Sequence, residues 1–259
     1  MSNIYHDFFQ KLKLYLEILE IDKKHHGINN CSDEEIENLT VKYGKLPTAF
    51  EEYLKSIGKT LLFEFMNAEN MSYEGLDYAE EFSKEVFEEN KISFNRPLLV
   101  ISERRNDYVS FIYLDENENP SVWITSHYWD DEFEKEKNLS KRTNKFTDIF
   151  LSFFNSTLND FTATFHFVND EEKNENENVV RDRYMNWFRN LLKVNEIIKL
   201  KKEDNLLIAE LNNIFLSYYI PGEETIKKEL AEDDQRKKLE YLKNNKPNSI
   251  LDRIKKFFN

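Results

Sequence analysis

Three apolar runs separated by two short polar segments constrain the fold more than any other feature of this sequence. The runs are Pro97–Ser102, Tyr108–Leu114 and Ser121–Tyr128, and the segments between them read ERRND and DENENP. The runs are rich in β-branched and aromatic residues, and the polar segments have the length of hairpin turns. We therefore predict an antiparallel meander of three strands, and the composition of Leu61–Met66 predicts a further strand before it.

Two short helices with well-marked ends are predicted before the meander. Ser32–Glu35 and Thr48–Glu51 both have the capping-box pattern, in which Ser or Thr and a Glu three residues later satisfy free amides at a helix N-terminus. Gly44 and Gly58 follow the two apolar patterns, and glycine is the residue that most readily ends a helix. We expect one helix between Ser32 and Gly44 and a second between Thr48 and Gly58.

Further helices are predicted on both sides of the meander. Apolar residues recur at helical spacing over 4–20 and 74–89, and an aromatic-rich run from Phe146 to Phe154 predicts a closing helix. Helices followed by an antiparallel meander and a closing helix define an α+β fold. We therefore predict that residues 1–160 form one domain, with N-terminal helices packed on an antiparallel sheet.

Residues 161–259 are predicted to form a smaller C-terminal α+β extension of unknown role. A polar run without apolar residues, NDEEKNENEN, places the boundary between about 160 and 178. A helical pattern explains 206–219 nearly as well as two strands do, because short apolar runs are ambiguous. The expected strands are Thr162–Val168, Ile197–Lys201, Leu206–Leu211 and Ile214–Ile220, and the expected helices are Val179–Lys193, Glu223–Asn244 and Ser249–Phe258.

The net charge of −13 is unevenly distributed. Residues 1–160 contain 18 Lys and Arg against 31 Asp and Glu, whereas residues 161–259 contain 18 of each. The most acidic stretch, Thr60–Asn90, has nine acidic residues and one basic residue. A general nucleic-acid-binding protein needs a basic face for phosphates, and an anionic lipid surface attracts basic segments. We therefore expect neither nucleic acid nor membrane among the partners.

Targeting and redox features are absent from the sequence. The N-terminus has no basic segment followed by an unbroken apolar stretch, and no window approaches the roughly 18 apolar residues that a membrane span requires. We therefore expect a cytoplasmic protein. Its single cysteine, Cys31, excludes a disulfide framework, a zinc ribbon and a CxxC redox pair.

The residues with catalytic or metal-binding chemistry form no recognised constellation. His25 and His26 are adjacent, but no partner follows them at ligand spacing. Asp115–Pro120 begins like a calcium loop, but proline stands where that loop requires glycine. Cys31 precedes a helix N-cap, which can lower a thiol pKa, but no base is placed beside it. We predict no catalytic residue, no metal and no cofactor, and expect that the protein is not an enzyme.

The acidic stretch is the outstanding chemical feature. One interpretation is a solvated helix face that keeps the protein soluble. The other is a docking surface for a basic protein, because negative charge attracts a cationic partner and raises the association rate. The aromatic pair Tyr128-Trp129 would supply apolar contact area beside the charges, whereas Trp123 is assigned to the core. The predicted partner-binding residues are Glu74, Asp77, Glu80, Glu81, Glu85, Tyr128, Trp129, Asp130, Asp131 and Glu132.

The order of these features resembles the SUKH superfamily, the Smi–Knr-like proteins. In residues 33–58 the resemblance consists of a helix, a glycine, a Leu-Pro pair, an aromatic residue and a capped helix that ends near a glycine. The strand order and the aromatic closing helix are also similar, so the resemblance covers about 1–160. The chain departs from the family at 57–59, which lack its Asn-Gly, and at 104–107, which lack a glycine-containing turn. The matching residues are Glu34, Ile36, Leu39, Gly44, Leu46, Pro47, Phe50, Tyr53, Leu54 and Gly58.

The resemblance implies a binding module without catalytic residues. Bacterial proteins of this family are mostly immunity proteins, which bind and neutralise a polymorphic or contact-dependent toxin, and fungal relatives regulate cell-wall synthesis. Our leading hypothesis is therefore a bacterial immunity protein of a toxin–antitoxin pair, whose acidic surface binds a cognate toxin such as a basic nuclease.

Two other hypotheses come from different functional classes. The first is a non-enzymatic regulatory scaffold of the cell-wall-regulator type, which binds a housekeeping partner and uses the C-terminal extension as a second docking surface. The second is a hydrolase that uses His127 with Asp130 or Asp131 for acid–base chemistry, for which a concave pocket holding these side chains together is required.

Overall fold

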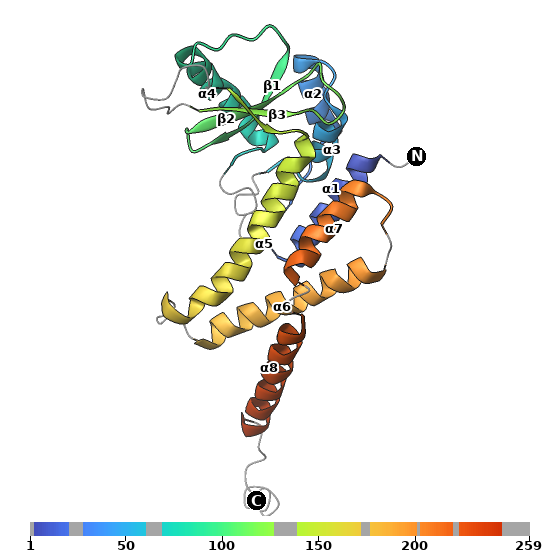
Figure 1. The fold of residues 1–259 in the computed structure, drawn as a ribbon, viewed down its shortest axis with the longest axis vertical. Helices are drawn as coiled ribbons and strands as arrows, with labels where there is room; N and C mark the ends of the chain where they lie inside the picture. The colour runs from blue at the N-terminus through green and yellow to red at the C-terminus, as the bar shows by residue number, and fades with distance from the viewer. Residues whose placement is uncertain are drawn as a thin grey trace, which may run out of the picture.

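The computed structural model describes residues 3–20, 28–60, 69–126, 139–171, 177–200, 203–219 and 223–244. In this part of the chain it shows helices and one antiparallel sheet, which confirms the α+β class (Figure 1). The helices before the sheet are α1 (Ile4–Ile18), α2 (Asp33–Tyr43), α3 (Thr48–Ser56), a 3-10 turn η1 (Tyr73–Gly75) and α4 (Leu76–Glu89). The strands are β1 (Leu98–Arg104), β2 (Tyr108–Tyr113), β3 (Val122–Ser126) and β4 (Ser140–Thr143), and the later helices are α5 (Phe146–Glu171), α6 (Glu177–Leu200), α7 (Leu206–Tyr219) and α8 (Glu223–Asn244).

The sheet has the strand order β1-β2-β3-β4, with each strand antiparallel to the next. The three-strand meander predicted from the sequence is therefore confirmed. The fourth strand was not predicted, because its sequence SKRT lacks the apolar and β-branched residues that indicate a strand. The strand predicted at 61–66 and the helix predicted at 249–258 lie outside the described residues.

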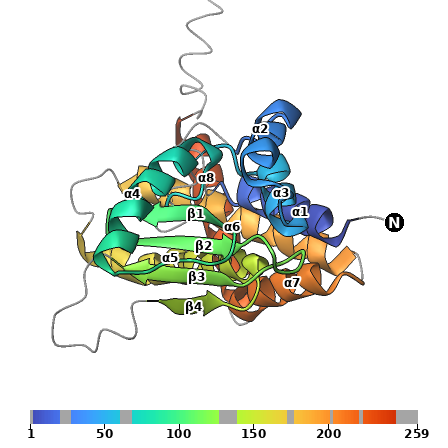
Figure 2. The ribbon, with the colours of Figure 1, turned by 90° about the horizontal axis from the view of Figure 1, so that it is seen from above.

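Helices cover the sheet on both faces (Figure 2). Helix α4 packs on β1 and β2, where Ala79 and Val86 meet Val100, Val109 and Phe111. Side chains that alternate with these along the strands point to the opposite face and join a larger cluster formed with α1, α3 and α5. Trp123 pairs with Phe111 across the strands and lies partly buried on the α4 side.

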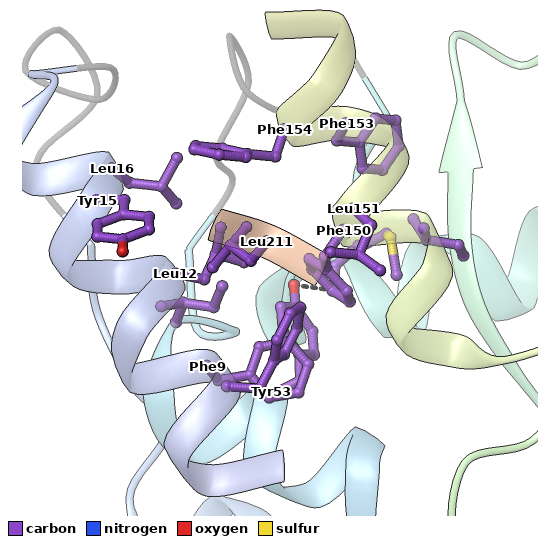
Figure 3. Packing of buried hydrophobic residues seen from close by; sticks show 14 of the residues in the cluster. Phe9, Leu12, Tyr15, Leu16, Tyr53, Phe150, Leu151, Phe153, Phe154 and Leu211 are labelled. Carbon is purple, nitrogen blue, oxygen red and sulfur yellow. Dashed lines mark hydrogen bonds between the residues drawn. The ribbon is translucent and has the colours of Figure 1, made fainter. Parts of the chain in front are cut away.

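The larger cluster is centred on aromatic side chains from helices far apart in the sequence (Figure 3). The ring of Tyr53 in α3 lies 4.9 Å from that of Phe150 in α5, and Phe9 of α1 meets Phe150 edge to face at 5.0 Å between centroids. The Tyr53 hydroxyl donates to the carbonyl of Met71 at 3.0 Å, so the buried phenol is satisfied. Such rings bury large apolar areas and fix the helices against the sheet.

The capping box predicted at Ser32 is present in the structure, and the one predicted at Thr48 is not. Ser32 and Glu35 form the predicted capping box, and α2 ends at Gly44 with φ of 85°, a value that favours glycine. Thr48 was predicted as the N-cap of α3, which was wrong: Thr48 is the first residue inside the helix. Pro47 takes the N-cap position, and its carbonyl accepts from the amide of Glu51 at 3.0 Å.

The strands predicted after residue 160 were also wrong. Residues 162–168 belong to α5, 197–200 belong to α6, and the described residues of 206–219 form α7, so the described C-terminal part is helical rather than α+β. In α7, Ile208, Leu211 and Phe215 are buried at the i, i+3 and i+7 spacing of a helix, the alternative that the sequence left open. Short apolar runs fit the period of a strand as well as that of a helix, and only the 14-residue length of the whole segment favours a helix.

The N-terminal and C-terminal segments share one core. Residue 160, where the boundary was predicted, lies inside α5. The Tyr15 hydroxyl of α1 donates to Asn212 Oδ1 of α7 at 2.6 Å, and the Tyr15 ring stacks on Phe154 at 6.2 Å and also contacts Phe215. Helix α7 therefore completes the burial of α1, while the division into two domains stays a prediction.

Candidate functional site

Five of the predicted partner-binding residues lie on η1 and α4. The side chain of Ser72 caps this segment by accepting from the amide of Gly75 at 3.1 Å. Ala79 and Val86 then pack on the sheet, Leu76 and Ser83 are also buried, and the acidic residues of α4 lie on the other sides of the helix. We call the set Glu74, Asp77, Glu80, Glu81 and Glu85 the α4 acidic surface.

Four members of the α4 acidic surface are exposed, and the fifth is half-buried. Lys42 at the end of α2 contacts Asp77 at 3.2 Å and Glu80 at 2.6 Å, and the Tyr43 hydroxyl donates to Glu80 at 2.7 Å. Burial opposes ionisation of Glu80, but the hydrogen bonds from Lys42 and Tyr43 outweigh it and hold the pKa of Glu80 below its ordinary value. Glu80 therefore joins α2 to α4.

Glu81 and Glu85 have no hydrogen-bond or ion-pair partner among the described residues. They stand at positions i and i+4 on one face of α4, where like charges repel. The last turn of α4 contains no basic residue, and its Glu88 and Glu89 lie at the negative end of the helix dipole. The charge of this surface is therefore not balanced within the described part of the molecule.

Two exposed apolar side chains accompany the acidic residues. Tyr78 is 52% exposed on α4, and Val41 is 81% exposed on α2. The Tyr78 hydroxyl donates to Asn106 Oδ1 at 2.7 Å, which holds the ring beside the turn between β1 and β2. Sequence reasoning missed Tyr78, although a helical projection from Ala79 places it on the outer face.

The β1–β2 turn has an unusual backbone. Arg105 and Asn106 have positive φ values of 47° and 58°, and the amide of Asp107 donates to the carbonyl of Arg104 at 2.7 Å. Two consecutive residues at positive φ characterise the type I′ hairpin turn, which normally takes Asn-Gly. Arg105 and Asn106 thus adopt a backbone conformation that glycine favours.

The other predicted anchors, Tyr128, Trp129, Asp130, Asp131 and Glu132, lie outside the described residues. So do His127, His25 and His26.

A buried polar cluster on the sheet was not predicted either. Glu69 is 1% exposed and accepts hydrogen bonds from Ser102, Tyr108 and Ser110 and from Arg142 Nη1 at 2.6 Å. Burial opposes the charge of Arg142, but Glu69 outweighs it and raises the pKa of the guanidinium. These donors all converge on the carboxylate, and its burial closes it to a substrate. The cluster therefore holds β4 on the sheet.

Among the described residues, the cysteine and the calcium-like segment noted in the sequence are buried or paired with other side chains. Burial raises the pKa of the Cys31 thiol to about 12, so it is not a thiolate at neutral pH. Asp115, in the calcium-like segment, pairs with Arg96 at 2.6 Å, and Asn119 exchanges hydrogen bonds with Thr147 at the start of α5. Within the described residues, no three His, Cys, Asp or Glu side chains are grouped as metal ligands would be.

Comparison of the chain with family models, with curated proteins and with solved structures finds no match. The SUKH resemblance thus depends on the residues quoted for it above. In the part of the chain that the structure describes, no helix has the length and apolar character needed to cross a membrane.

Proposed function

We propose that this protein is a bacterial immunity protein that binds and neutralises a cognate, basic toxin through the α4 acidic surface. The observation that carries the proposal is the unbalanced charge of Glu81 and Glu85 beside the exposed ring of Tyr78, all on a helix fixed by its buried face. Exposed carboxylates around an aromatic side chain combine attraction at a distance with apolar area at contact.

The chemistry of the surface defines the partner. Unpaired carboxylates favour lysine and arginine side chains, and proteins that bind phosphates, such as nucleases, must present these residues around their active sites. A protein docked on such a basic surface would block access of nucleic acid to it. Long-range attraction would make association fast, and this attraction would weaken as salt increases.

The experiment is co-expression with the products of the genes that flank its own, followed by co-purification and growth assays. The test variant is Glu81→Lys/Glu85→Lys, because neither carboxylate has a partner among the described residues. Glu80 is left unchanged, since its reversal would also break the contact with Lys42 and Tyr43. The control is Glu210→Lys/Glu232→Lys, which makes the same charge change at exposed positions of α7 and α8.

We expect the wild type and the control to rescue growth and to co-purify with the toxin. The affinity of the test variant for the toxin should fall by about tenfold or more, because two charge pairs at the edge of the interface are lost. Absence of a complex with the wild type would overturn the proposal. Recovery of a resident enzyme in place of a toxin would favour the regulatory scaffold.

A further inference from the structure

Two arginines and a tyrosine lie together on the sheet face opposite α4. Arg104 of β1 is paired across the strands with Tyr108 of β2. The next pair is Glu103 with Val109, and Val109 packs on the α4 side, so strand alternation places Arg104 and Tyr108 on the other face. The guanidinium carbons of Arg104 and of Arg142 from β4 lie 5.8 Å and 5.7 Å from the centre of the Tyr108 ring. Two guanidinium groups therefore approach one phenol ring from strands on either side of β2.

One of these two positive charges is balanced by a carboxylate, and the other is not. Glu69 is 1% exposed; its Oε1 lies 2.6 Å from Arg142 Nη1, and its Oε2 accepts from the Tyr108 hydroxyl at 3.2 Å. Both oxygens of Glu69 are therefore occupied. Within the described ranges, no Asp or Glu side chain forms an ion pair with Arg104. The surroundings of the Tyr108 ring thus carry one positive charge that the described residues do not balance.

Arg104 also has a hydrogen-bond donor that is not satisfied. Its Nε is closed to solvent and has no partner in the described structure, although the side chain as a whole is only half-buried. A buried donor without an acceptor is costly, and the cost is larger for a charged group. An oxygen of an anion would satisfy this donor and balance the charge at the same time. A guanidinium group suits this role because its donors form a planar fork.

The pKa of Tyr108 shows that both arginines act at the same place. Burial is the main cause that raises the pKa of the Tyr108 hydroxyl, and the charge of Glu69 adds to it, whereas the charges of Arg142 and Arg104 oppose the shift. Positive charges that favour a phenolate equally favour another anion beside them.

The carboxylates next to this place do not occupy it. Glu103 lies on the α4 face, and its Oε2 accepts from the amide of Asn106 at 3.3 Å. Asp107 is exposed on the β1–β2 turn, where solvent and salt screen its charge. The net charge of −13 does not oppose an anion here either, because exposed charges further apart than about 8 Å are largely screened at physiological salt.

We propose that Arg104, with Arg142 and Tyr108 beside it, binds the phosphate group of a small ligand. A phosphate group has oxygens in several directions, so it can meet donors that come from both sides of a strand, whereas a planar carboxylate offers two oxygens in one plane. Arginine binds phosphate oxygens through paired N–H groups, and the charge of the ligand would balance the guanidinium that Glu69 leaves unpaired.

The test is isothermal titration calorimetry of the full chain with inorganic phosphate and with adenosine monophosphate, with chloride used to keep the ionic strength constant. We expect saturable binding of inorganic phosphate at one site. Arg104→Gln should weaken it by about tenfold or more, because the charge and the fork of donors are both lost. Arg104→Lys keeps the charge but loses the fork, and should weaken it by about threefold or more. Tighter binding of adenosine monophosphate supports a phosphate carried by a nucleotide, and equal or weaker binding supports free phosphate.

Matched controls make the same changes at the neighbouring residue. Arg105 is exposed on the β1–β2 turn, so Arg105→Gln and Arg105→Lys should bind phosphate within about twofold of the wild type. If circular dichroism shows that Arg104→Gln is unfolded, the comparison of Arg104→Lys with Arg105→Lys decides. Absence of phosphate binding by the wild type would overturn the proposal. Equal losses from the changes at Arg104 and at Arg105 would also overturn it, because they would indicate a general effect of surface charge.

Discussion

At the scale of single residues, the buried pair of Glu69 and Arg142 makes a sharp prediction. Arg142→Met would leave Glu69 buried and without its cation, which we expect to cost about 3 kcal/mol in the free energy of unfolding. The double change Glu69→Gln/Arg142→Met should be less destabilising than Arg142→Met, because no unpaired charge remains. Urea denaturation of the wild type and the two variants measures this, and a double variant that is as unstable as Arg142→Met, or more so, would contradict it.

The strained β1–β2 turn makes a second prediction at this scale. Asparagine tolerates positive φ better than arginine, so Arg105→Asn should stabilise the fold by about 0.5–1 kcal/mol. Asn106→Ala should do the opposite, because it loses both this tolerance and the hydrogen bond from Tyr78. Thermal unfolding of both variants tests this. If both variants were less stable than the wild type, the effect would be a general one of mutation and not relief of strain in the turn.

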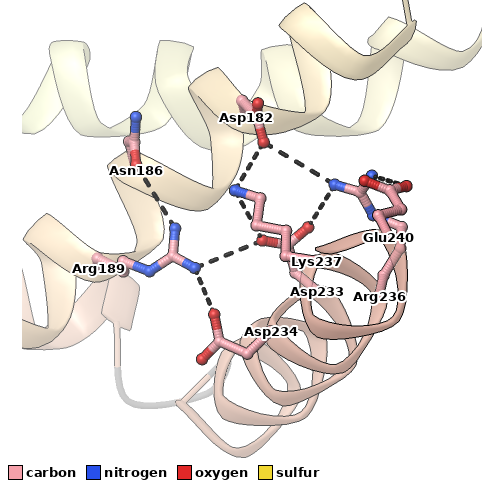
Figure 4. Close-up of polar contacts among 8 residues, drawn as sticks. All are labelled: Asp182, Asn186, Arg189, Asp233, Asp234, Arg236, Lys237 and Glu240. Atoms are coloured by element: carbon pink, nitrogen blue, oxygen red, sulfur yellow. Dashed lines mark hydrogen bonds and ion pairs between the residues drawn. The ribbon is translucent and has the colours of Figure 1, made fainter. Parts of the chain in front are cut away.

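At the scale of elements, Asp233 of α8 forms ion pairs within its own helix and one, to Arg189 at 3.4 Å, that reaches α6 (Figure 4). Burial opposes its ionisation, but hydrogen bonds from Arg236 and Lys237 outweigh it and lower the pKa of Asp233. A lowered pKa in the folded state means that this stability is complete above the ordinary aspartate range and is lost as pH falls through the lowered value. We therefore expect the contribution of Asp233 to the stability of α8 to be complete at neutral pH and to be lost only in acid.

Asp233→Asn should remove this acid-dependent component and weaken the attachment at neutral pH by about 2 kcal/mol. Hydrogen exchange of α8, compared between wild type and variant at each pH with α5 as internal reference, measures both effects. Equal protection of α8 in the two proteins at neutral pH would show that Leu230 and its neighbours hold the helix without the ion pairs.

Repulsion between Glu81 and Glu85 lowers the stability of helix α4, and a role in binding would explain why both carboxylates are present. Glu81→Gln/Glu85→Gln should stabilise the free protein by about 0.5 kcal/mol, because it relieves repulsion at i and i+4. If the surface binds a basic partner, the same change should weaken that complex. Denaturant unfolding and binding measured on one variant separate a docking surface from a merely solvated face, which would gain stability and lose nothing.

Local sequence patterns predicted the elements whose signals are local. Residue spacing and the period of a helix or strand predict the meander, the Ser32 capping box and the outer position of the α4 acidic surface. Strand β4 could not be found in this way, because Arg142 is placed by Glu69, 73 positions away. Likewise, the pairing of Glu80 with Lys42 depends on how α2 lies against α4.

At the scale of the whole molecule, the N-terminal and C-terminal segments, which were predicted as separate domains, share one core. The C-terminal helices complete the core around Tyr15, so this segment supports the fold as well as extending it. Helix α4, which carries the acidic surface, and helix α8 lie at opposite ends of the longest axis of the molecule (Figure 1).

The most direct measurement is growth rescue by the wild type, by Glu81→Lys/Glu85→Lys and by Glu210→Lys/Glu232→Lys, each co-expressed with the products of the genes that flank its own, as candidate toxins. We predict that the wild type and the α7–α8 control protect the cells and co-purify with the toxin, while reversal on α4 abolishes protection without unfolding the protein. Protection that is absent with the wild type, or unchanged by reversal on α4, would contradict toxin capture by this surface.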